Sequence, residues 1–340
     1  MDIFECLQQI SVLSSTAPDK LQQLADDLMR RMTEPHRYWH TLHHLEDLWT
    51  RIPKDVSGEL FDKVRLAILF HDAIYLPDSS TNEEESARLF LKSVELEQPF
   101  VEEVALAIEG TKTGQGTGPT AEILNALDRS ILNETSTAKL MAWEKAVAKE
   151  YQYVSWPDYR KGRCEFLRQQ NIETLNRLAE YVEAYRPTIG IYAGSFNPFH
   201  LGHFDILAKA EKLFDKVVVA VGTNPTKADE SPENRTMQIK SCIPYREVRP
   251  FSNLLIELVQ EIRTYANPVV VRGLRDGFDL QFELNQARFH EDLLPGIEIV
   301  YLPCGREFQH ISSSAIRALQ QFSSETAQNK ARDYLPKSFC

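Results

Sequence analysis

The chain has 340 residues, of which 43% are hydrophobic and 26% are charged, and its formal net charge is -11. This length favours two domains over one. The acidic balance excludes the broad basic surface that nucleic-acid binding requires. The five cysteines lie far apart without a C-x-x-C pair, the first residues lack a secretory signal pattern, and no apolar run is long enough to span a membrane. We therefore expect a cytoplasmic protein with reduced thiols and with neither a nucleic-acid nor a membrane partner.

Residues 1 to about 185 have the apolar spacing of helices. Leu21, Leu24, Leu28 and Met32 recur at steps of three and four residues, and similar patterns follow around residues 66–70 and 101–108. Glycine and proline are sparse except at 77–80 and 114–119, which we expect to be loops. The pattern predicts an all-α domain over residues 1–186.

This helical part contains five of the nine histidines within its first 71 residues. His40 and His44 are four residues apart, which places both on one face of an expected helix. His71 and Asp72 are adjacent in a second apolar helix, where burying an aspartate is costly unless a metal or a hydrogen-bond donor compensates its charge. Asp128, in the segment L-D-R-S-I-L, is a further candidate.

The order H, then H-D, then D resembles the HD superfamily of metal-dependent phosphohydrolases. The resemblance implies that His44, His71, Asp72 and Asp128 bind one divalent metal ion, and this donor set suits Mn²⁺, Fe²⁺, Ni²⁺ or Mg²⁺ better than a closed tetrahedral zinc site. It also implies hydrolysis of a phosphorylated small molecule that the sequence does not identify. The alternative is an HD domain that senses or regulates without turnover.

After Pro187 the pattern changes to β-branched runs that alternate with helices. Strands are predicted at 188–192, 216–222, 268–272 and 297–302, and helices near 203–214, 253–266, 278–293 and 313–321. Such alternation predicts an α/β domain over residues 187–340, with a parallel sheet and helices on both faces. Ligands bind such sheets at the carboxyl ends of the strands.

The first of these strands runs into the segment G-S-F-N-P-F-H-L-G-H, residues 194–203. Its glycines and its proline allow the backbone to turn sharply and to approach a ligand closely. The loop opens a helix, whose N-terminus favours phosphate, and His200 and His203 stand at that point. Two imidazoles there can donate hydrogen bonds to phosphate oxygens.

The spacing H-x-G-H resembles the signature of the nucleotidyltransferase superfamily, and the whole half is similar to bacterial phosphopantetheine adenylyltransferases. The similarity continues, in order, through residues 217–227, V-R-G-L-R at 271–275, F-E-L with Ala287 at 282–287, and I-S-S-S with Arg317 at 311–317. The resemblance implies a Rossmann-like fold. It also implies a homo-oligomer.

The resemblance further implies transfer of AMP from ATP, accompanied by Mg²⁺, to 4'-phosphopantetheine, with release of dephospho-coenzyme A and pyrophosphate. His200 and His203 would contact the ATP phosphates, and Lys227 and Arg272 would hold the acceptor phosphate. The nucleotide-binding residues would be Gly194, Ser195, Phe196, Arg275, Glu283, Ser312, Ser313, Ser314 and Arg317.

Two residues depart from the pattern of that family. Asn197 stands where aspartate is more common, and Phe282 stands where tyrosine is common. The segment G-S-F-N-P-x-H is also similar to nicotinamide mononucleotide adenylyltransferases, so that nucleotide is the alternative acceptor. The lysine loop and the arginine motif favour phosphopantetheine.

Overall fold

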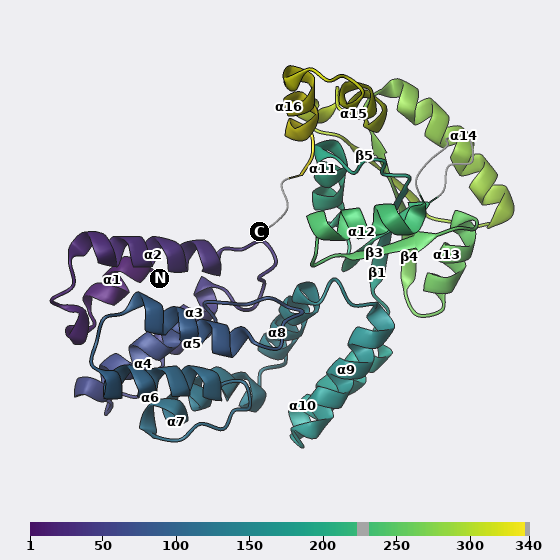
Figure 1. The fold of residues 1–340 in the computed structure, drawn as a ribbon. Helices are drawn as coiled ribbons and strands as arrows, with labels where there is room; N and C mark the ends of the chain where they lie inside the picture. The colour runs from purple at the N-terminus through teal and green to yellow at the C-terminus, as the bar shows by residue number, and fades with distance from the viewer. Residues whose placement is uncertain (223–230, 337–340) are drawn as a thin grey trace. The chain divides into compact units, whose positions relative to one another are not determined.

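The computed structural model describes residues 1–222 and 231–336 (Figure 1). The chain divides into two compact units, one formed by 1–150 with 164–180 and the other by 151–163 with 181 onward. Whether 1–186 and 187–340 fold separately stays a prediction. Among the described residues, no helix combines the length and the apolar character needed to cross a membrane. The four described cysteines are free thiols.

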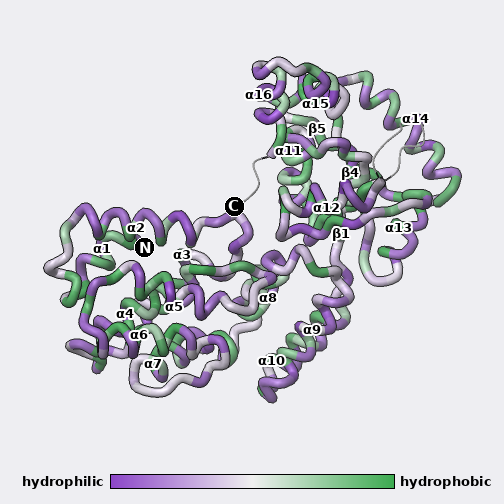
Figure 2. The backbone as a smooth tube through the Cα atoms, viewed as in Figure 1, coloured by the Kyte–Doolittle hydropathy of each residue, from purple (hydrophilic) through white to green (hydrophobic). Residues whose placement is uncertain are grey.

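The first part of the chain is helical, as predicted. Its elements are α1 (Ile3–Gln8), η1 (Ser11–Leu13), α2 (Pro18–Met32), α3 (Leu42–Thr50), α4 (Gly58–Phe70), α5 (Asn82–Ser93), α6 (Gln98–Gly110), α7 (Pro119–Asp128), η2 (Arg129–Asn133), α8 (Thr137–Glu150), α9 (Trp156–Gln169) and α10 (Glu173–Ala184). Hydrophobic and hydrophilic stretches alternate along these helices (Figure 2).

Helix α4 is the centre of this unit because it contacts α3, α5, α6 and α7. Its last turn, residues 66–70, is completely buried, and Phe70 packs edge-to-face on Phe90 of α5. The buried end of α4 carries His71 and Asp72 directly after it. A rigid, fully packed helix therefore positions the histidine–aspartate pair.

The second part contains a parallel sheet of five strands, in the order β3-β2-β1-β4-β5. The strands are β1 (Thr188–Gly194), β2 (Lys216–Gly222), β3 (Glu247–Phe251), β4 (Asn267–Leu274) and β5 (Ile299–Pro303). The helices and turns are α11 (Leu201–Ala210), α12 (Pro232–Cys242), α13 (Leu255–Arg263), α14 (Gly277–Leu293), η3 (Arg306–Phe308), α15 (Ser313–Gln320) and α16 (Glu325–Asp333).

The strand order reverses at β1, which lies between β2 and β4. Right-handed crossovers then place α11 and α12 on one face of the sheet and α13 and α14 on the other (Figure 1). The crevice beyond the carboxyl ends of β1 and β4 is the switch point at which such sheets bind ligands. The parallel α/β architecture predicted from the sequence is confirmed.

Sequence reasoning missed four elements of this unit, namely β3, α12, the short turn η3 and α16. β3 contains Pro250, a residue type that is rare inside strands. The strand lies at the edge of the sheet and pairs with β2 alone, so the missing N–H of proline costs no ladder hydrogen bond on its outer side.

A buried lysine joins the segment 151–163 to the sheet. Lys216 of β2 is 5% exposed, its Nζ donates to the carbonyl oxygen of Val154 at 2.8 Å, and it pairs with Glu247 Oε2 at 3.0 Å. Burial lowers the pKa of this lysine, and Glu247 opposes that shift. The segment just after α8 therefore belongs structurally to the α/β unit.

Candidate functional site

A cavity of about 420 Å³ opens beyond the carboxyl ends of β1 and β4. The strand ends, the loop after β1, the start of α11, helix α14 and the start of α15 form its wall. The wall includes almost all the nucleotidyltransferase residues predicted from the sequence that the structure describes: Gly194, Ser195, Phe196, His200, His203, Arg272, Arg275, Glu283, Ser312, Ser313 and Ser314.

The loop after β1 has a tightly specified backbone. Phe196 adopts a left-handed conformation with φ of 46°, and the Asn197–Pro198 peptide bond is cis. A Cβ atom at Gly194 would lie 2.9 Å from the Phe196 ring, so only glycine fits there. The loop brings Ser195 and His200 to the cavity.

His200 and His203 stack at the start of α11, with ring centroids 3.6 Å apart. The backbone N–H of His200 donates to Nδ1 of His203 at 3.2 Å, so the neutral His203 ring carries its hydrogen on Nε2. Burial, together with Arg275, lowers the pKa of His200 to about 4, and burial with the neighbouring His200 lowers the pKa of His203 well below its usual value. Both rings are neutral at pH 7 and can act as hydrogen-bond donors.

The two arginines of the R-G-L-R motif line the cavity, and each is held by a carboxylate of α14. Arg272 forms two bonds of 2.6 Å with Glu283 and donates to the Ala193 carbonyl at 2.9 Å. Arg275 binds Asp279 through Nε at 2.8 Å and Nη2 at 2.9 Å. Sequence reasoning missed Asp279. These pairs fix the guanidinium planes and leave their remaining N–H groups for anions.

The three serines begin α15. Ser312 is the N-cap and accepts from the N–H of Ala315 at 3.1 Å, while Ser313 donates to the Pro198 carbonyl at 3.0 Å. The start of this helix is therefore fixed to the loop after β1. Its free N–H groups and hydroxyls face the same cavity as the histidines.

Two predicted residues do not join this arrangement in the described structure. Arg317 does not line the cavity, because its guanidinium donates to the Asn197 carbonyl and to Ser314 Oγ. Arg317 thus holds the loop after β1 from outside the cavity. Lys227 lies outside the described residues.

Arg235 of α12 was not predicted from the sequence, although its side chain binds the backbone of the loop after β1. It is 1% exposed and donates to the carbonyl oxygens of Ser195 and of Gly222, the last residue of β2. One buried guanidinium thus ties together the ends of two neighbouring strands. Its signal in the sequence, a single arginine in a polar helix, is too weak to be distinguished from a surface residue.

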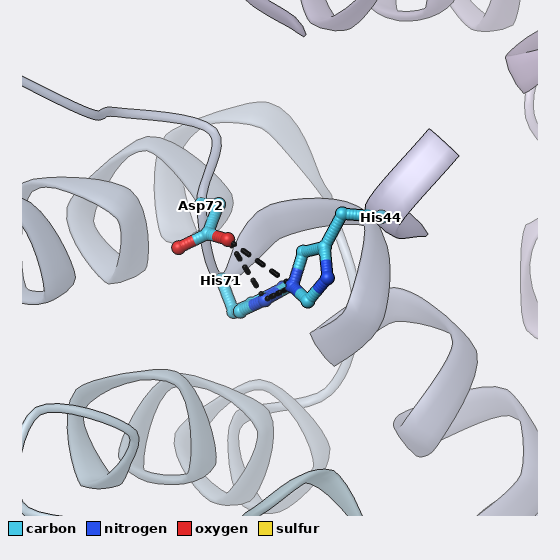
Figure 3. A group of neighbouring side chains, drawn as sticks. All are labelled: His44, His71 and Asp72. Atoms are coloured by element: carbon cyan, nitrogen blue, oxygen red, sulfur yellow. Dashed lines mark hydrogen bonds and ion pairs between the residues drawn. The ribbon is translucent and has the colours of Figure 1, made fainter. Parts of the chain in front are cut away.

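A second cluster lies in the helical unit, where His44, His71 and Asp72 bring one ligand atom each within 4.8 Å of one another (Figure 3). His71 Nε2 lies 3.4 Å from His44 Nε2 and 3.1 Å from Asp72 Oδ2. Asp128 Oδ1 lies 3.2 Å from His44 Nε2 and 3.8 Å from His71 Nε2. The fold therefore brings together all four residues that the sequence proposed as metal ligands.

The donor atoms of this cluster suit a divalent cation. His71 Nδ1 lies 2.9 Å from the Ile68 carbonyl, which fixes the hydrogen on Nδ1 and leaves Nε2 as an acceptor. The buried Oδ2 of Asp72 accepts no hydrogen bond of good geometry. The Nε2 atoms of two imidazoles and an unsatisfied carboxylate oxygen thus face one point.

The electrostatics of the cluster favour positive charge at the same point. Burial opposes charge on His71, but attraction to Asp72 and Asp128 outweighs it and raises the pKa of His71 well above its usual value. Burial likewise opposes ionisation of the two carboxyls, yet the histidines hold the pKa of each below its usual range. A bound metal ion would supply this charge in place of a proton.

Two expectations about local structure in this unit were wrong. His40 does not share a helix with His44, because α3 begins at Leu42, but the two rings still lie 6.0 Å apart. His71 and Asp72 follow α4 rather than lie inside it, since His71 is the C-cap residue. The end of the helix turns both side chains toward α3.

Sequence reasoning also missed Glu150, the last residue of α8, which is 1% exposed. Its Oε1 accepts the N–H groups of Tyr38, Trp39 and His40 at 2.8, 2.7 and 3.0 Å. Its Oε2 lies 2.7 Å from His40 Nδ1 and accepts from the Tyr75 hydroxyl at 2.9 Å. The carboxylate fixes the turn that leads into α3 and His44.

Comparison with known proteins gives a family match in the α/β unit. Residues 191–319 match the model of the cytidylyltransferase-like family. A phosphopantetheine adenylyltransferase from Beijerinckia indica is 35% identical over 138 residues, covering 38% of this chain and 81% of that relative. The corresponding proteins of Clostridium perfringens (35% over 153 residues, 44% and 88%) and Picosynechococcus sp. (38% over 138 residues, 39% and 76%) are similar.

The chain belongs to the phosphopantetheine adenylyltransferase family. Membership rests on its C-terminal part, which is the part that forms the parallel sheet and the cavity. The matched range includes the H-x-G-H loop, the R-G-L-R motif and the first helical turns of α15. The cavity of this phosphopantetheine adenylyltransferase-like unit is therefore the candidate nucleotidyltransferase site.

Proposed function

We propose that the C-terminal part transfers the AMP part of ATP to 4'-phosphopantetheine. The observation that carries this proposal is the single cavity shared by His200, His203, Arg272, Arg275 and the N-terminus of α15. These are donors and cations suited to a triphosphate and a second phosphate. The relatives named above act as phosphopantetheine adenylyltransferases, and their reaction is the one proposed here.

In this reaction an oxygen of the acceptor phosphate attacks the α-phosphorus of ATP, and the bond to the β-phosphate oxygen breaks as pyrophosphate leaves. The nucleophile is already anionic, so no general base is needed. The neutral rings of His200 and His203 would donate to the phosphate oxygens as charge shifts to the leaving group. Arg272 and Lys227 would hold the acceptor, and Arg275 the triphosphate. Mg²⁺ would arrive with ATP and shield its phosphates.

The identity of the acceptor is tested by measuring pyrophosphate release from ATP and Mg²⁺ in parallel reactions, one with 4'-phosphopantetheine and one with nicotinamide mononucleotide as acceptor. We expect release with phosphopantetheine alone. Release with nicotinamide mononucleotide alone would establish the alternative acceptor. Release with neither would contradict adenylyl transfer to both.

We propose further that the helical unit is an HD-type phosphohydrolase that binds one divalent metal ion through His44, His71, Asp72 and Asp128. The convergence of their donor atoms and the unsatisfied Asp72 Oδ2 support this proposal. A metal held there would supply Lewis acidity toward a phosphate ester. His71, with its Nδ1 directed at the Ile68 carbonyl, would present Nε2 to that metal.

Metal binding is tested by calorimetric titration of the purified full chain with Mn²⁺, Fe²⁺, Ni²⁺ and Mg²⁺ in turn. We expect one site per chain that is lost in His71→Ala and retained in His310→Ala, a histidine of the other unit. Hydrolysis of 4-nitrophenyl phosphate by the metal-loaded protein then separates a catalytic domain from one that only senses. Equal metal binding by the wild type and His71→Ala would refute the site.

We also propose that the protein forms a homo-oligomer through α14. None of the 17 residues of this helix is buried, and Phe278, Phe282 and Phe289 are 88%, 60% and 55% exposed. Apolar patches of this kind mark association surfaces. A second copy that covered this helix would bury these rings close to Glu283, which holds Arg272.

A further inference from the structure

A second cavity, also of about 420 Å³, opens beside the metal-ligand cluster of the helical unit. His44 and Asp128, two of the proposed ligands, form part of its wall. The remaining wall comes from the turn before α3, from α3 itself, from η2 and from one face of α8. A molecule in this cavity would reach the ligand cluster directly.

Part of the cavity wall is apolar. The Trp39 ring lies 5.6 Å from the His44 ring and is fixed by an edge-on contact with Trp143 at 6.4 Å. Ala142 and Ala146, four residues apart on α8, face the same cavity and leave the space that larger side chains would fill. An aromatic ring and two alanines that line one cavity suit a flat or apolar group.

The cationic groups of the wall are each matched by a carboxylate of the same wall. Arg51 pairs with Asp47 and donates to Ser130 Oγ at 2.8 Å. Lys139 Nζ lies 3.1 Å from Glu134 Oε2. Because each cation is already neutralised, this wall does not favour a second anionic group on the ligand.

We propose that this cavity holds the leaving group of the substrate, and that the substrate is a phosphomonoester of an uncharged, apolar or aromatic alcohol. The proposal rests on the metal-dependent phosphohydrolase function proposed above. The phosphate would lie at the ligand cluster and the alcohol against Trp39 and Ala142. Hydrolysis forms a bond between a water oxygen and phosphorus and breaks the ester P–O bond, and a proton from water leaves with the alcohol. Polyphosphates and esters that carry a second charge fit this wall poorly.

The test is calorimetric binding of three phosphonates, which cannot be hydrolysed, to the Mn²⁺-loaded full chain. Methylphosphonate measures the cluster alone, phenylphosphonate adds an apolar ring, and 4-carboxyphenylphosphonate adds a charge to that ring. We expect phenylphosphonate to bind about 10-fold more tightly than methylphosphonate, since burying part of a ring contributes this order of affinity. The carboxylated ring should bind no more tightly than the plain ring.

Substitution locates the ring in the cavity. Ala142→Trp fills space in the cavity that Trp39 also lines, and it should remove the advantage of the phenyl group while methylphosphonate binds as before. Leu106→Trp, at an exposed position of α6 outside this cavity, should keep that advantage. Equal binding of methyl- and phenylphosphonate to the wild type, or tighter binding of the carboxylated ring, would overturn the assignment of the leaving group. Failure of the metal site itself gives a different result, namely no Mn²⁺ uptake and no binding of any phosphonate.

Discussion

The buried carboxylate of Glu150 offers a quantitative test of how the helical unit is organised. Its two oxygens receive three backbone N–H groups, the Tyr75 hydroxyl and the His40 ring, at 2.7 to 3.0 Å. Burial opposes its charge, but His40 and these bonds lower the pKa of Glu150 to about 2. Replacing this residue should therefore destabilise the unit more than any exposed glutamate does.

The expected magnitude follows from the groups left without a partner. Glu150→Ala leaves several buried donors without an acceptor. Each unsatisfied donor costs about 1–3 kcal/mol, although water can enter the space. We expect a loss of about 3–5 kcal/mol in the free energy of unfolding, as for one removed member of a buried pair. Glu150→Gln keeps an acceptor for the N–H groups and loses the charge. A shift of one pKa unit is worth about 1.4 kcal/mol and the pKa falls from 4.5 to about 2, so the loss there should not exceed about 3.5 kcal/mol.

The pH dependence has a defined sign. A carboxyl whose folded pKa is depressed contributes stability above its unfolded pKa of about 4.5, and this stability is lost as the pH falls toward about 2. The difference between the wild type and Glu150→Gln should therefore shrink as the pH falls below 4.5.

The assay is urea unfolding followed by tryptophan fluorescence, since Trp39, Trp49 and Trp143 all lie in the helical unit. Glu102→Ala, an exposed glutamate of α6, is the control and should unfold like the wild type. A Glu150→Ala protein within 1 kcal/mol of the wild type would refute the view that this carboxylate organises the turn before His44.

Three further predictions concern the α/β unit. Arg235→Met should lower both the free energy of unfolding, by about 2–5 kcal/mol, and the rate of pyrophosphate release, because two strand-end carbonyls lose their donor; unchanged stability and rate would contradict this role. As the pH falls from 6.5 toward about 4, the depressed pKa of His200, the unit should lose stability, because the unfolded chain binds a proton there more readily than the folded one. In thermal unfolding scans His200→Asn should show a weaker dependence of stability on pH, and equal pH dependence in both proteins would contradict this. In sedimentation velocity runs Phe289→Glu should lower the sedimentation coefficient toward that of a monomer, whereas Phe322→Glu, an exposed control outside α14, should not. A monomeric wild type would exclude association through α14.

The sequence predicted the elements whose pattern is local and strong. β2 has the bounds expected for it, and α14 begins and ends within one residue of the prediction. β3 was missed because Pro250 is tolerated only at a sheet edge, and edge position is a property of the assembled sheet. The α12 helix, with proline, asparagine and few apolar residues, carries too weak a periodicity to be recognised.

The sites show the same division between local pattern and tertiary contact. The H-x-G-H loop and the histidine–aspartate pair are short motifs, and the fold places them in a cavity and in a ligand cluster. Glu150 lies more than a hundred residues from the backbone groups it binds, so no local signal predicted its role. Arg317 stands at the expected spacing, but its guanidinium binds the Asn197 carbonyl of the loop and does not face the cavity.

The most direct test of the central claim is pyrophosphate release from ATP and 4'-phosphopantetheine by the wild type and by His203→Ala, with His310→Ala as control. The neutral His203 ring, fixed by the His200 N–H, should contribute about 10²–10³-fold to the rate, as a removed transition-state donor does. We predict that the wild type and His310→Ala release pyrophosphate at equal rates and that His203→Ala loses nearly all activity. An unchanged rate in His203→Ala, or no release by the wild type, would contradict the assignment of this cavity as an adenylyltransferase site.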